Sequence, residues 1–404
     1  MDTNIIAIFR KSSASPFAAS RFGVDAARAA KRFHESFPTY EYTPLHSMAR
    51  LARHLGLKSF YVKDESYRFG LNAFKALGGV YALGRIMTRK LGDDPGLMNY
   101  QSLISPEIRR RLGDITFVTA TDGNHGRGLA WAAHTFGQKS VVYMPKGSAH
   151  ERLENIRAAG AEASITDLNY DDAVRRAGHM AREKGWILVQ DTVLPGYTDI
   201  PSYIMQGYTT MALEAAEQLP DEPPTHIFLQ AGVGAMAGAV TAFFRDLYRG
   251  TDQLKVIIVE TSVANCLQRT AQSPDGNLQI VTGDMDSIMA GLCCGEPCSI
   301  GWDILKDHAD CFISCPDYVA ADGMRLLGNP PAGDPQVISG ESGAVTAGLV
   351  YELMSDPKLY PIRQELDLNK NSRVLCFSTE GATDTANYRS AVWEGRYPNP
   401  SHLK

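Results

Sequence analysis

The sequence has no long apolar run and no long basic run. None of its segments approaches the roughly 18 uninterrupted apolar residues that a membrane-spanning helix needs. The first residues, MDTNIIAIFRKSSASPF, have an acidic second position and only a short apolar stretch, which is typical of neither a secretory signal nor a transit peptide. The 40 Lys and Arg residues stand against 45 Asp and Glu, a formal net charge of -5. We therefore expect a cytoplasmic protein that binds neither a membrane nor nucleic acid.

Cysteine is sparse and odd in number, with seven in 404 residues and five of them between 293 and 315. A long chain of this kind without an export signal does not predict a disulfide framework. The spacing Cys294-x3-Cys298 with Cys311-x3-Cys315 has some likeness to zinc ligands, but no histidine completes a usual ligand pattern. We expect free thiols and no metal site. One disulfide near this group of cysteines stays an open alternative.

Two nucleotide-binding motifs are also missing. The run QAGVGAMAG at 230–238 has the order G-x-G-x-x-x-G, which differs from the dinucleotide fingerprint, and no acidic residue stands where a ribose would be bound. No G-K-[ST] is present either, which excludes a nucleoside triphosphate loop. The run does follow the strand pattern HIFLQ and precede the helical pattern AVTAFFRDLY. A generic tight turn is the plainer reading, but glycines at a helix start let backbone amides approach an anion, so we predict a phosphate site.

The length of the chain favours two hydrophobic cores. From about residue 114, short apolar runs such as ITFVTA and KSVVYMP alternate with helical patterns, and a second alternation begins near residue 200. Strand, helix, strand at this spacing predicts parallel sheets covered on both faces. We expect a small domain at 80–198 and a large domain made of 1–79 and 199–404. The site is expected in the cleft between them, at the carboxyl ends of the strands.

TDGNHGRG at 121–128 also follows a strand pattern and opens a helix. Its amides and Asn124 suit a carboxylate or a ring oxygen. Asp122 stands at a turn that favours anions, which fits a carboxylate engaged in chemistry, although helix capping is the simpler reading. His125 is expected to be packed at the helix start, so it is left out of the catalytic set.

Lys75 lies in SYRFGLNAFKALGG at 66–79, ahead of both glycine-rich turns. A lone lysine is usually solvated, but an amine followed by two such turns suits an aldehyde cofactor that carries a phosphate. Burial beside a phosphate and an aldehyde is one way to produce the neutral, nucleophilic amine. The three segments together predict pyridoxal phosphate.

Taken together, NAFKALGG, TATDGNHGRGLAWAA, QAGVGAMAG, ISGESGAV and STEG resemble the pyridoxal phosphate enzymes of the tryptophan synthase β-subunit fold, known as fold type II. The likeness runs over most of the chain. It implies an α/β protein of two lobes, each a mostly parallel twisted sheet flanked by helices, and a homodimer.

Longer runs narrow the resemblance to the diaminopropionate ammonia-lyases, among them VKDESYRFGLNAFK, YMPKGSAHER and VQDTVLPGYTDIP. Related dehydratases usually carry Ser or Thr where this chain has Asp122, so Asp122 favours the lyase. A serine or threonine dehydratase of the same fold is the alternative, followed by a racemase. An inactive binding protein is disfavoured because Lys75 and both glycine turns are intact.

The resemblance also implies a reaction and a role for each site residue. The reaction is the α,β-elimination of D- and L-2,3-diaminopropionate, through an aminoacrylate, to pyruvate and two ammonia. Lys75 forms the Schiff base, Asp122 serves the D-isomer, and Asp191 or the freed Lys75 serves the L-isomer; a strand-end cap is the plainer reading of Asp191. Asn124 binds the phenolic oxygen of the cofactor. The remaining implied cofactor contacts are phosphate-loop amides, two hydroxyls of which one faces the pyridine nitrogen, and a carboxylate beside the ring: Gly232, Val233, Gly234, Ala235, Met236, Ser378, Thr379 and Glu341.

Overall fold

The computed structural model describes residues 4–10, 21–121, 123–191, 193, 196–220, 222–251 and 253–402. By its contacts the chain divides into two compact units. Unit 1 comprises Met1–Ala19, Thr43–Tyr67 and Glu214–Lys404, and unit 2 comprises Ser20–Tyr42 and Arg68–Leu213. These bounds differ from the expected small domain at 80–198, because flanking segments on both sides of it cluster with unit 2.

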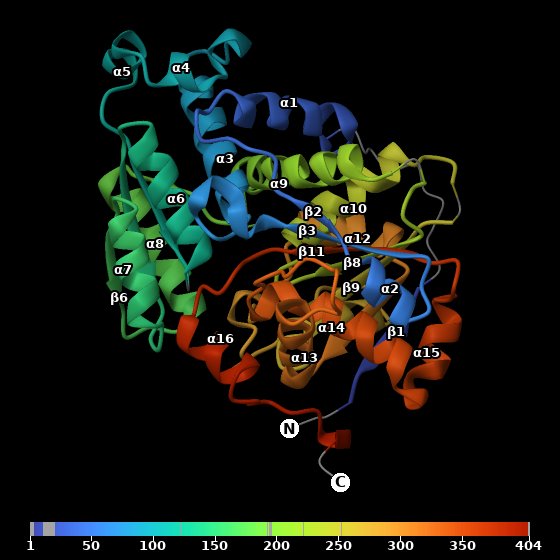
Figure 1. Cartoon of the computed structure of the whole chain (residues 1–404). Coiled ribbons are helices and arrows are strands. Elements are labelled where there is room, and N and C mark those ends of the chain that lie inside the picture. Colours follow the sequence, from blue (N-terminus) through green and yellow to red (C-terminus); the bar gives the residue numbers. More distant parts are fainter. Residues whose placement is uncertain are drawn as a thin grey trace. The chain divides into compact units, whose positions relative to one another are not determined.

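Unit 1 is built on a seven-stranded sheet, counted over its described residues (Figure 1). The strand order is β1-β10-β9-β8-β11-β3-β2, with parallel pairs in the interior and antiparallel pairs only at the two edges. The strands are β1 (Ile6–Phe9), β2 (Leu45–Ser47), β3 (Ser59–Asp64), β8 (His226–Gln230), β9 (Lys255–Thr261), β10 (Cys311–Cys315) and β11 (Arg373–Ser378). Interior strands such as β8 are buried at every residue, as expected for parallel strands covered on both faces.

Helices cover both faces of this sheet. They are α2 (Ala49–His54), α10 (Ala235–Leu247), α11 (Cys266–Gln272), α12 (Ser299–His308), α13 (Asp317–Gly328), α14 (Glu341–Ser355), α15 (Tyr360–Glu365) and α16 (Thr385–Val392). Short 3-10 turns are η2 (Glu65–Gly70), η4 (Ala290–Leu292), η5 (Pro357–Leu359) and η6 (Pro400–His402). Helix α13 packs on α14, and α14 packs on β8 and β11. Figure 1 shows α13 and α14 on one side of the strands and α10 with α12 on the other.

The order of the strands shows where the direction of the chain reverses in unit 1, which is where we expect a ligand to bind. The chain runs from β8 to β9 and β10 in one direction, then returns to β11 on the other side of β8. Right-handed crossovers made in opposite directions lie on opposite faces, so the connections diverge between β8 and β11. In open parallel sheets, ligands bind outside the carboxyl ends of the strands at this point of reversal. The segments that follow β8 and β11 carry the predicted phosphate loop and the STEG turn.

Unit 2 contains a four-stranded parallel sheet in its described residues, with the order β6-β5-β4-β7. Its strands are β4 (Thr116–Ala120), β5 (Lys139–Met144), β6 (Glu162–Ile165) and β7 (Ile187–Leu188). Its helices are α1 (Val24–Glu35), α3 (Lys75–Lys90), η3 (Pro95–Leu97), α4 (Tyr100–Leu103), α5 (Pro106–Leu112), α6 (Asn124–Thr135), α7 (His150–Ala158), α8 (Tyr170–Lys184) and most of α9 (Asp199–Gln218). Among the described helices of the chain, none is long and apolar enough to cross a membrane.

Helices α1 and α9 join unit 2 because both pack on α3. The buried His34 of α1 bonds through Nδ1 to the Thr210 hydroxyl at 2.8 Å and through Nε2 to the Leu77 carbonyl oxygen at 3.0 Å. Helix α9 approaches so closely at Gly207 that a Cβ there would lie 2.4 Å from the same carbonyl oxygen. These contacts join residues far apart in sequence, so periodicity alone did not reveal them.

The start of α3 is held against the start of α6 by glycine. A Cβ on Gly128 would lie 2.9 Å from the Cα of Ala76 and 3.2 Å from the carbonyl carbon of Lys75. Across the same contact, a Cβ on Gly79 would lie 3.5 Å from the carbonyl carbon of Gly128. The absence of a side chain therefore lets the Lys75–Ala76 peptide rest on the first turns of the helix that begins at Asn124.

Replacing Gly128 with alanine tests this contact. Because the nearest atoms are backbone and cannot rotate away, we expect Gly128→Ala to lower the free energy of unfolding by about 1–3 kcal/mol, the usual cost of overpacking. Gly178→Ala in α8 is the control, since its Cβ would meet atoms no nearer than 3.8 Å. Urea denaturation of both variants measures the difference, and equal effects would contradict the role given to Gly128.

Candidate active site

Lys75 and Asp191, predicted separately, form an ion pair in unit 2. Lys75 is the first residue of α3, and its Nζ lies 2.8 Å from Oδ2 of Asp191, which follows β7. The carboxylate side chain is 7% exposed and the lysine side chain 24%. Burial alone would raise the pKa of Asp191, but the charges of Lys75 and His125 and the hydrogen bond from Lys75 outweigh it. The pKa of Asp191 therefore lies well below its ordinary value, and the carboxylate is ionised.

His125 lies beside this pair. It is the second residue of α6, it is 3% exposed, and its Nε2 hydrogen-bonds the Val189 carbonyl oxygen at 2.9 Å. A carbonyl oxygen only accepts, so this contact places the proton on Nε2. The residue is packed, as the sequence led us to expect, yet it lies close enough to influence the titration of Asp191.

The turn between β4 and α6 carries two further predicted residues. Asn124 is the first residue of α6, while Asp122 lies outside the described residues. On either side of Asp122 the turn is fixed, because Thr121 donates its N–H to the Tyr143 carbonyl oxygen at 3.0 Å and its hydroxyl accepts from the Gly123 N–H at 3.1 Å.

The predicted phosphate loop in unit 1 turns its carbonyl oxygens into the protein. The Gly232 carbonyl accepts from the Cys266 thiol at 3.7 Å, and the Val233 carbonyl accepts from the Cys298 N–H at 2.7 Å. Gly234 has φ +91°, a conformation that glycine adopts without strain, and it precedes the first residue of α10. The first N–H groups of a helix lack intrahelical partners, and no described side chain caps this end. The loop therefore fits a phosphate group.

The carboxyl ends of β8 and β11 are tied together beside this loop. The amide of Gln230 donates to the Phe377 carbonyl oxygen and to the Thr379 hydroxyl oxygen, both at 2.8 Å. The Ser378 hydroxyl instead donates to the Ser339 hydroxyl oxygen at 2.8 Å. Thr379 thus accepts one bond and keeps its own proton for donation, whereas the Ser378 proton is directed at Ser339.

Glu341 is the first residue of α14 and is 2% exposed. Its carboxylate accepts a hydrogen bond from the side-chain amide of Asn387 in α16. Its role beside a cofactor ring stays a prediction. Among the described residues, no group of three or more His, Cys, Asp or Glu side chains is arranged to hold a metal ion, and the seven cysteines are separate thiols.

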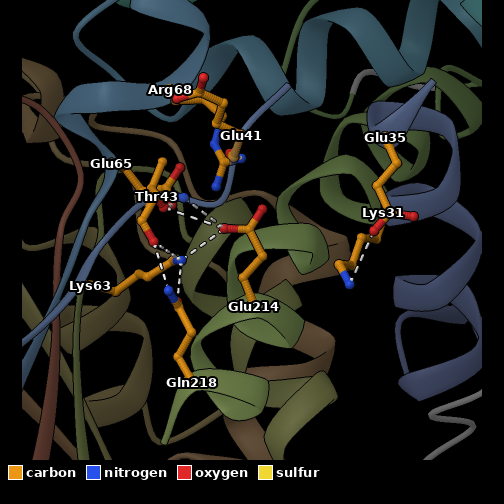
Figure 2. A network of polar contacts seen from close by, with 9 residues as sticks. All are labelled: Lys31, Glu35, Glu41, Thr43, Lys63, Glu65, Arg68, Glu214 and Gln218. Atoms are coloured by element: carbon orange, nitrogen blue, oxygen red, sulfur yellow. Dashed lines mark hydrogen bonds and ion pairs between the residues drawn. The ribbon is translucent and has the colours of Figure 1, made fainter. Parts of the chain in front are cut away.

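A buried ion pair supports the segment of unit 1 that precedes η2 (Figure 2). Lys63 and Glu214 are both fully buried, with Nζ and Oε2 2.7 Å apart. Lys63 also donates to the Thr43 carbonyl oxygen and to Gln218, each at 2.7 Å, and the Thr43 hydroxyl donates to Glu65 at 2.6 Å. The charges are desolvated but well supplied with hydrogen bonds, which makes the loss of one partner costly.

We expect Lys63→Met to reduce the free energy of unfolding by about 3–5 kcal/mol, because Glu214 would be left as a buried charge without its cation. The control is Lys58→Met, which breaks the exposed Lys58–Glu222 pair at 2.5 Å and should cost less than about 1 kcal/mol. Chemical denaturation at one pH compares the two. A loss as small in Lys63→Met as in the control would show that the buried pair contributes little.

Comparison with known proteins shows the family of the chain. The model of the pyridoxal-phosphate dependent enzymes matches residues 37–361. Diaminopropionate ammonia-lyase of Salmonella typhimurium is 52% identical over 368 residues, which cover 90% of this chain and 91% of that protein. The Escherichia coli K12 enzyme of the same name is 49% identical over 379 residues, covering 93% of each. The chain belongs to the diaminopropionate ammonia-lyase family of pyridoxal-phosphate dependent enzymes.

Solved structures extend this assignment to the fold. The crystal structure of Escherichia coli diaminopropionate ammonia-lyase in complex with D-serine has a TM-score of 0.91 and 45% identity to this chain and covers 98% of both chains. Tomato threonine deaminase, at 17% identity and a TM-score of 0.70, shares the fold alone. The predicted family, the fold type II architecture and the cofactor, pyridoxal phosphate, are confirmed.

Proposed function

We propose that this member of the diaminopropionate ammonia-lyase family itself converts D- and L-2,3-diaminopropionate to pyruvate and two ammonia. The observation that carries the proposal is the Lys75–Asp191 ion pair, which places the predicted Schiff-base lysine beside an ionised, buried carboxylate that can accept a proton. Diaminopropionate ammonia-lyase of Escherichia coli has been solved in complex with an aminoacrylate-PLP azomethine reaction intermediate. Threonine dehydratase of Salmonella typhimurium is only 29% identical over 58% of this chain, so the dehydratase alternative is less well supported.

Pyridoxal phosphate, when bound, supplies an aldehyde that joins to an amine and a ring that withdraws electrons from the α-carbon of the substrate. We assign the amine to Lys75 and the phosphate contacts to the amides of Gly232–Met236. Thr379, which keeps a hydroxyl proton, is the better candidate to face the pyridine nitrogen than Ser378. Asn124 and Glu341 keep their predicted roles, at the phenolic oxygen and beside the ring.

Asp191 suits the removal of the α-proton of the L-isomer. The charge of Lys75 holds the pKa of Asp191 low, and burial acts in the opposite direction. When Lys75 gives up its proton, its charge no longer lowers the pKa of Asp191, so the carboxylate becomes a stronger base than it is in the ion pair. Asp122 is assigned to the D-isomer, whose α-proton points to the opposite face. Either carboxylate also pairs with the β-ammonium of the substrate, which has to stay protonated to leave as ammonia.

Lys75→Ala should abolish the visible absorption of the lysine-bound cofactor, since no other residue is assigned to bond it. The exposed Lys58→Ala serves as control and should keep the band. Spectra recorded after incubation with pyridoxal phosphate and gel filtration measure the result. A colourless wild type, or a coloured Lys75→Ala protein, would overturn the assignment of Lys75.

Substitution of the two acids should separate the isomers. We expect Asp122→Asn to lose activity on the D-isomer, and Asp191→Asn on the L-isomer, each by about 10²- to 10⁴-fold as for loss of a general base, with much smaller effects on the other isomer. Pyruvate release with both isomers, and with D- and L-serine and threonine, measures this. Equal losses on both isomers would remove the two-base assignment, and a preference for serine or threonine would indicate a dehydratase.

Homodimeric assembly and a cytoplasmic location, both expected from the sequence, stay predictions. Light scattering coupled to gel filtration of the purified chain tests the first, with a mass of twice 44.2 kDa as the expected result.

A further inference from the structure

Gln190 immediately precedes Asp191, and its side chain is fully buried in unit 2. Its Oε1 accepts from the Thr119 hydroxyl at 2.8 Å and from the Ala120 N–H at 3.2 Å. Its Nε2 donates to the Ala120 carbonyl oxygen and to the Tyr170 hydroxyl oxygen, both at 3.1 Å. An amide offers two donors and two acceptor positions, so every position on this side chain is in use.

The Gln190 side chain bonds the backbone of β4 at the point where backbone pairing between β4 and β7 stops. The ladder pairs Phe117 with Ile187 and Val118 with Leu188, and the last rung is the Val189 N–H to the Val118 carbonyl oxygen at 2.9 Å. Two residues beyond Val118, the Ala120 N–H instead donates to Oε1 of Gln190, and the Ala120 carbonyl oxygen accepts from Nε2 of the same amide. A neutral amide thereby reproduces a β-sheet rung after the two strands have begun to separate.

The backbone that leads to Asp191 is fixed by side chains as well. The Tyr197 hydroxyl accepts from the Gln190 N–H at 2.8 Å and donates to the Leu188 carbonyl oxygen at 3.0 Å. The next carbonyl, that of Val189, is bonded by His125. Asp191 therefore follows a segment whose polar groups are held from several directions, and the same amide holds the last residue of the strand that leads into the 121–124 turn.

We propose that Gln190 is a positioning residue of the reaction, which fixes Asp191 against Lys75 and fixes the carboxyl end of β4 through a single side-chain amide. The kinetic part of this inference rests on the proposed function. A glutamate would have the same shape, but it would lack a donor for the Ala120 carbonyl when ionised and would add a second negative charge next to Asp191. The neutral amide avoids both problems.

Gln138 provides a matched control. It is also a buried glutamine of unit 2, and its side chain also satisfies backbone, accepting from the Ile115 N–H at 2.7 Å and donating to the Gly113 carbonyl oxygen at 3.3 Å. These contacts lie at the amino end of β4, the end of the strand opposite to Ala120. A loss of general stability would affect both glutamine variants, whereas a loss of positioning would affect only Gln190.

The kinetic test compares Gln190→Met with Gln138→Met on both isomers of diaminopropionate. We expect Gln190→Met to lower kcat by roughly 10²-fold, the effect of a misplacement of about 1 Å, with little change in KM. Both isomers should be affected, because Gln190 holds the segments next to Asp191 and next to Asp122. Gln138→Met should keep a kcat near that of the wild type. A drop in KM and kcat common to both variants would overturn the proposal.

The second test needs no activity. In the protein without cofactor, the rate at which an amine-reactive reagent labels Lys75, followed by peptide mass spectrometry over a range of pH, reports how firmly Asp191 holds the ammonium form. We expect Gln190→Met to shift this profile toward lower pH and Gln138→Met to leave it unchanged. Thr119→Val, which removes one bond to Gln190 without changing volume, should shift it less and in the same direction.

The two tests separate the proposals. A wild type that is inactive on both isomers would remove the proposed function, while the labelling profiles would still decide the role of Gln190. If Gln190→Met fails to fold, Thr119→Val carries the test. An unchanged profile in a folded Gln190→Met, or in Thr119→Val where only that variant folds, would overturn the positioning role.

Discussion

The ion pair between Lys75 and Asp191 is the interaction around which the candidate site of unit 2 is arranged. A buried carboxylate is unfavourable in its charged form, and here the amine 2.8 Å away reverses that preference. The charge state of one group is therefore set by the other. A site that moves protons gains from this arrangement, because a change at the amine alters the basicity of the carboxylate without any movement of the chain.

Keeping the pair in place requires backbone that cannot shift. The start of α3 rests on the start of α6 because Gly128 carries no side chain. The end of β7 is held by neutral side chains, chiefly those of Gln190 and Tyr197. Neutral groups suit this task, since a further buried charge would disturb the titration of Asp191. Packing and hydrogen bonding thus fix the atoms, and electrostatics then sets their protonation.

In unit 1, the corresponding feature is the glycine loop between β8 and α10, which we propose binds the phosphate of the cofactor. Its parallel strands end at one edge, and the reversal between β8 and β11 opens space there for a ligand. The Cys298 N–H and the Cys266 thiol engage the carbonyl oxygens of the loop after β8, and no described side chain caps the start of α10, which suits the phosphate site that we propose there. Elsewhere in the unit, the Lys63–Glu214 pair shows that charge is tolerated in the interior where the ammonium group makes three hydrogen bonds, one of them to the carboxylate.

The sequence alone determined the family, the cofactor and the alternating α/β architecture. These features depend on local patterns, namely the glycine runs between strand and helix and the lysine of NAFK. Such patterns can be recognised in the sequence itself. Only the tertiary structure decided that Asp191 pairs with Lys75, that the hydroxyls of Ser378 and Thr379 have different partners, and that α1 and α9 belong with unit 2. No sequence pattern identified Gln190, because a glutamine followed by an aspartate does not show which strand the amide will bond. That partner, β4, is known only from the fold. Hydrogen bonds between residues 70 or more positions apart are formed by the fold, and a linear pattern does not contain them.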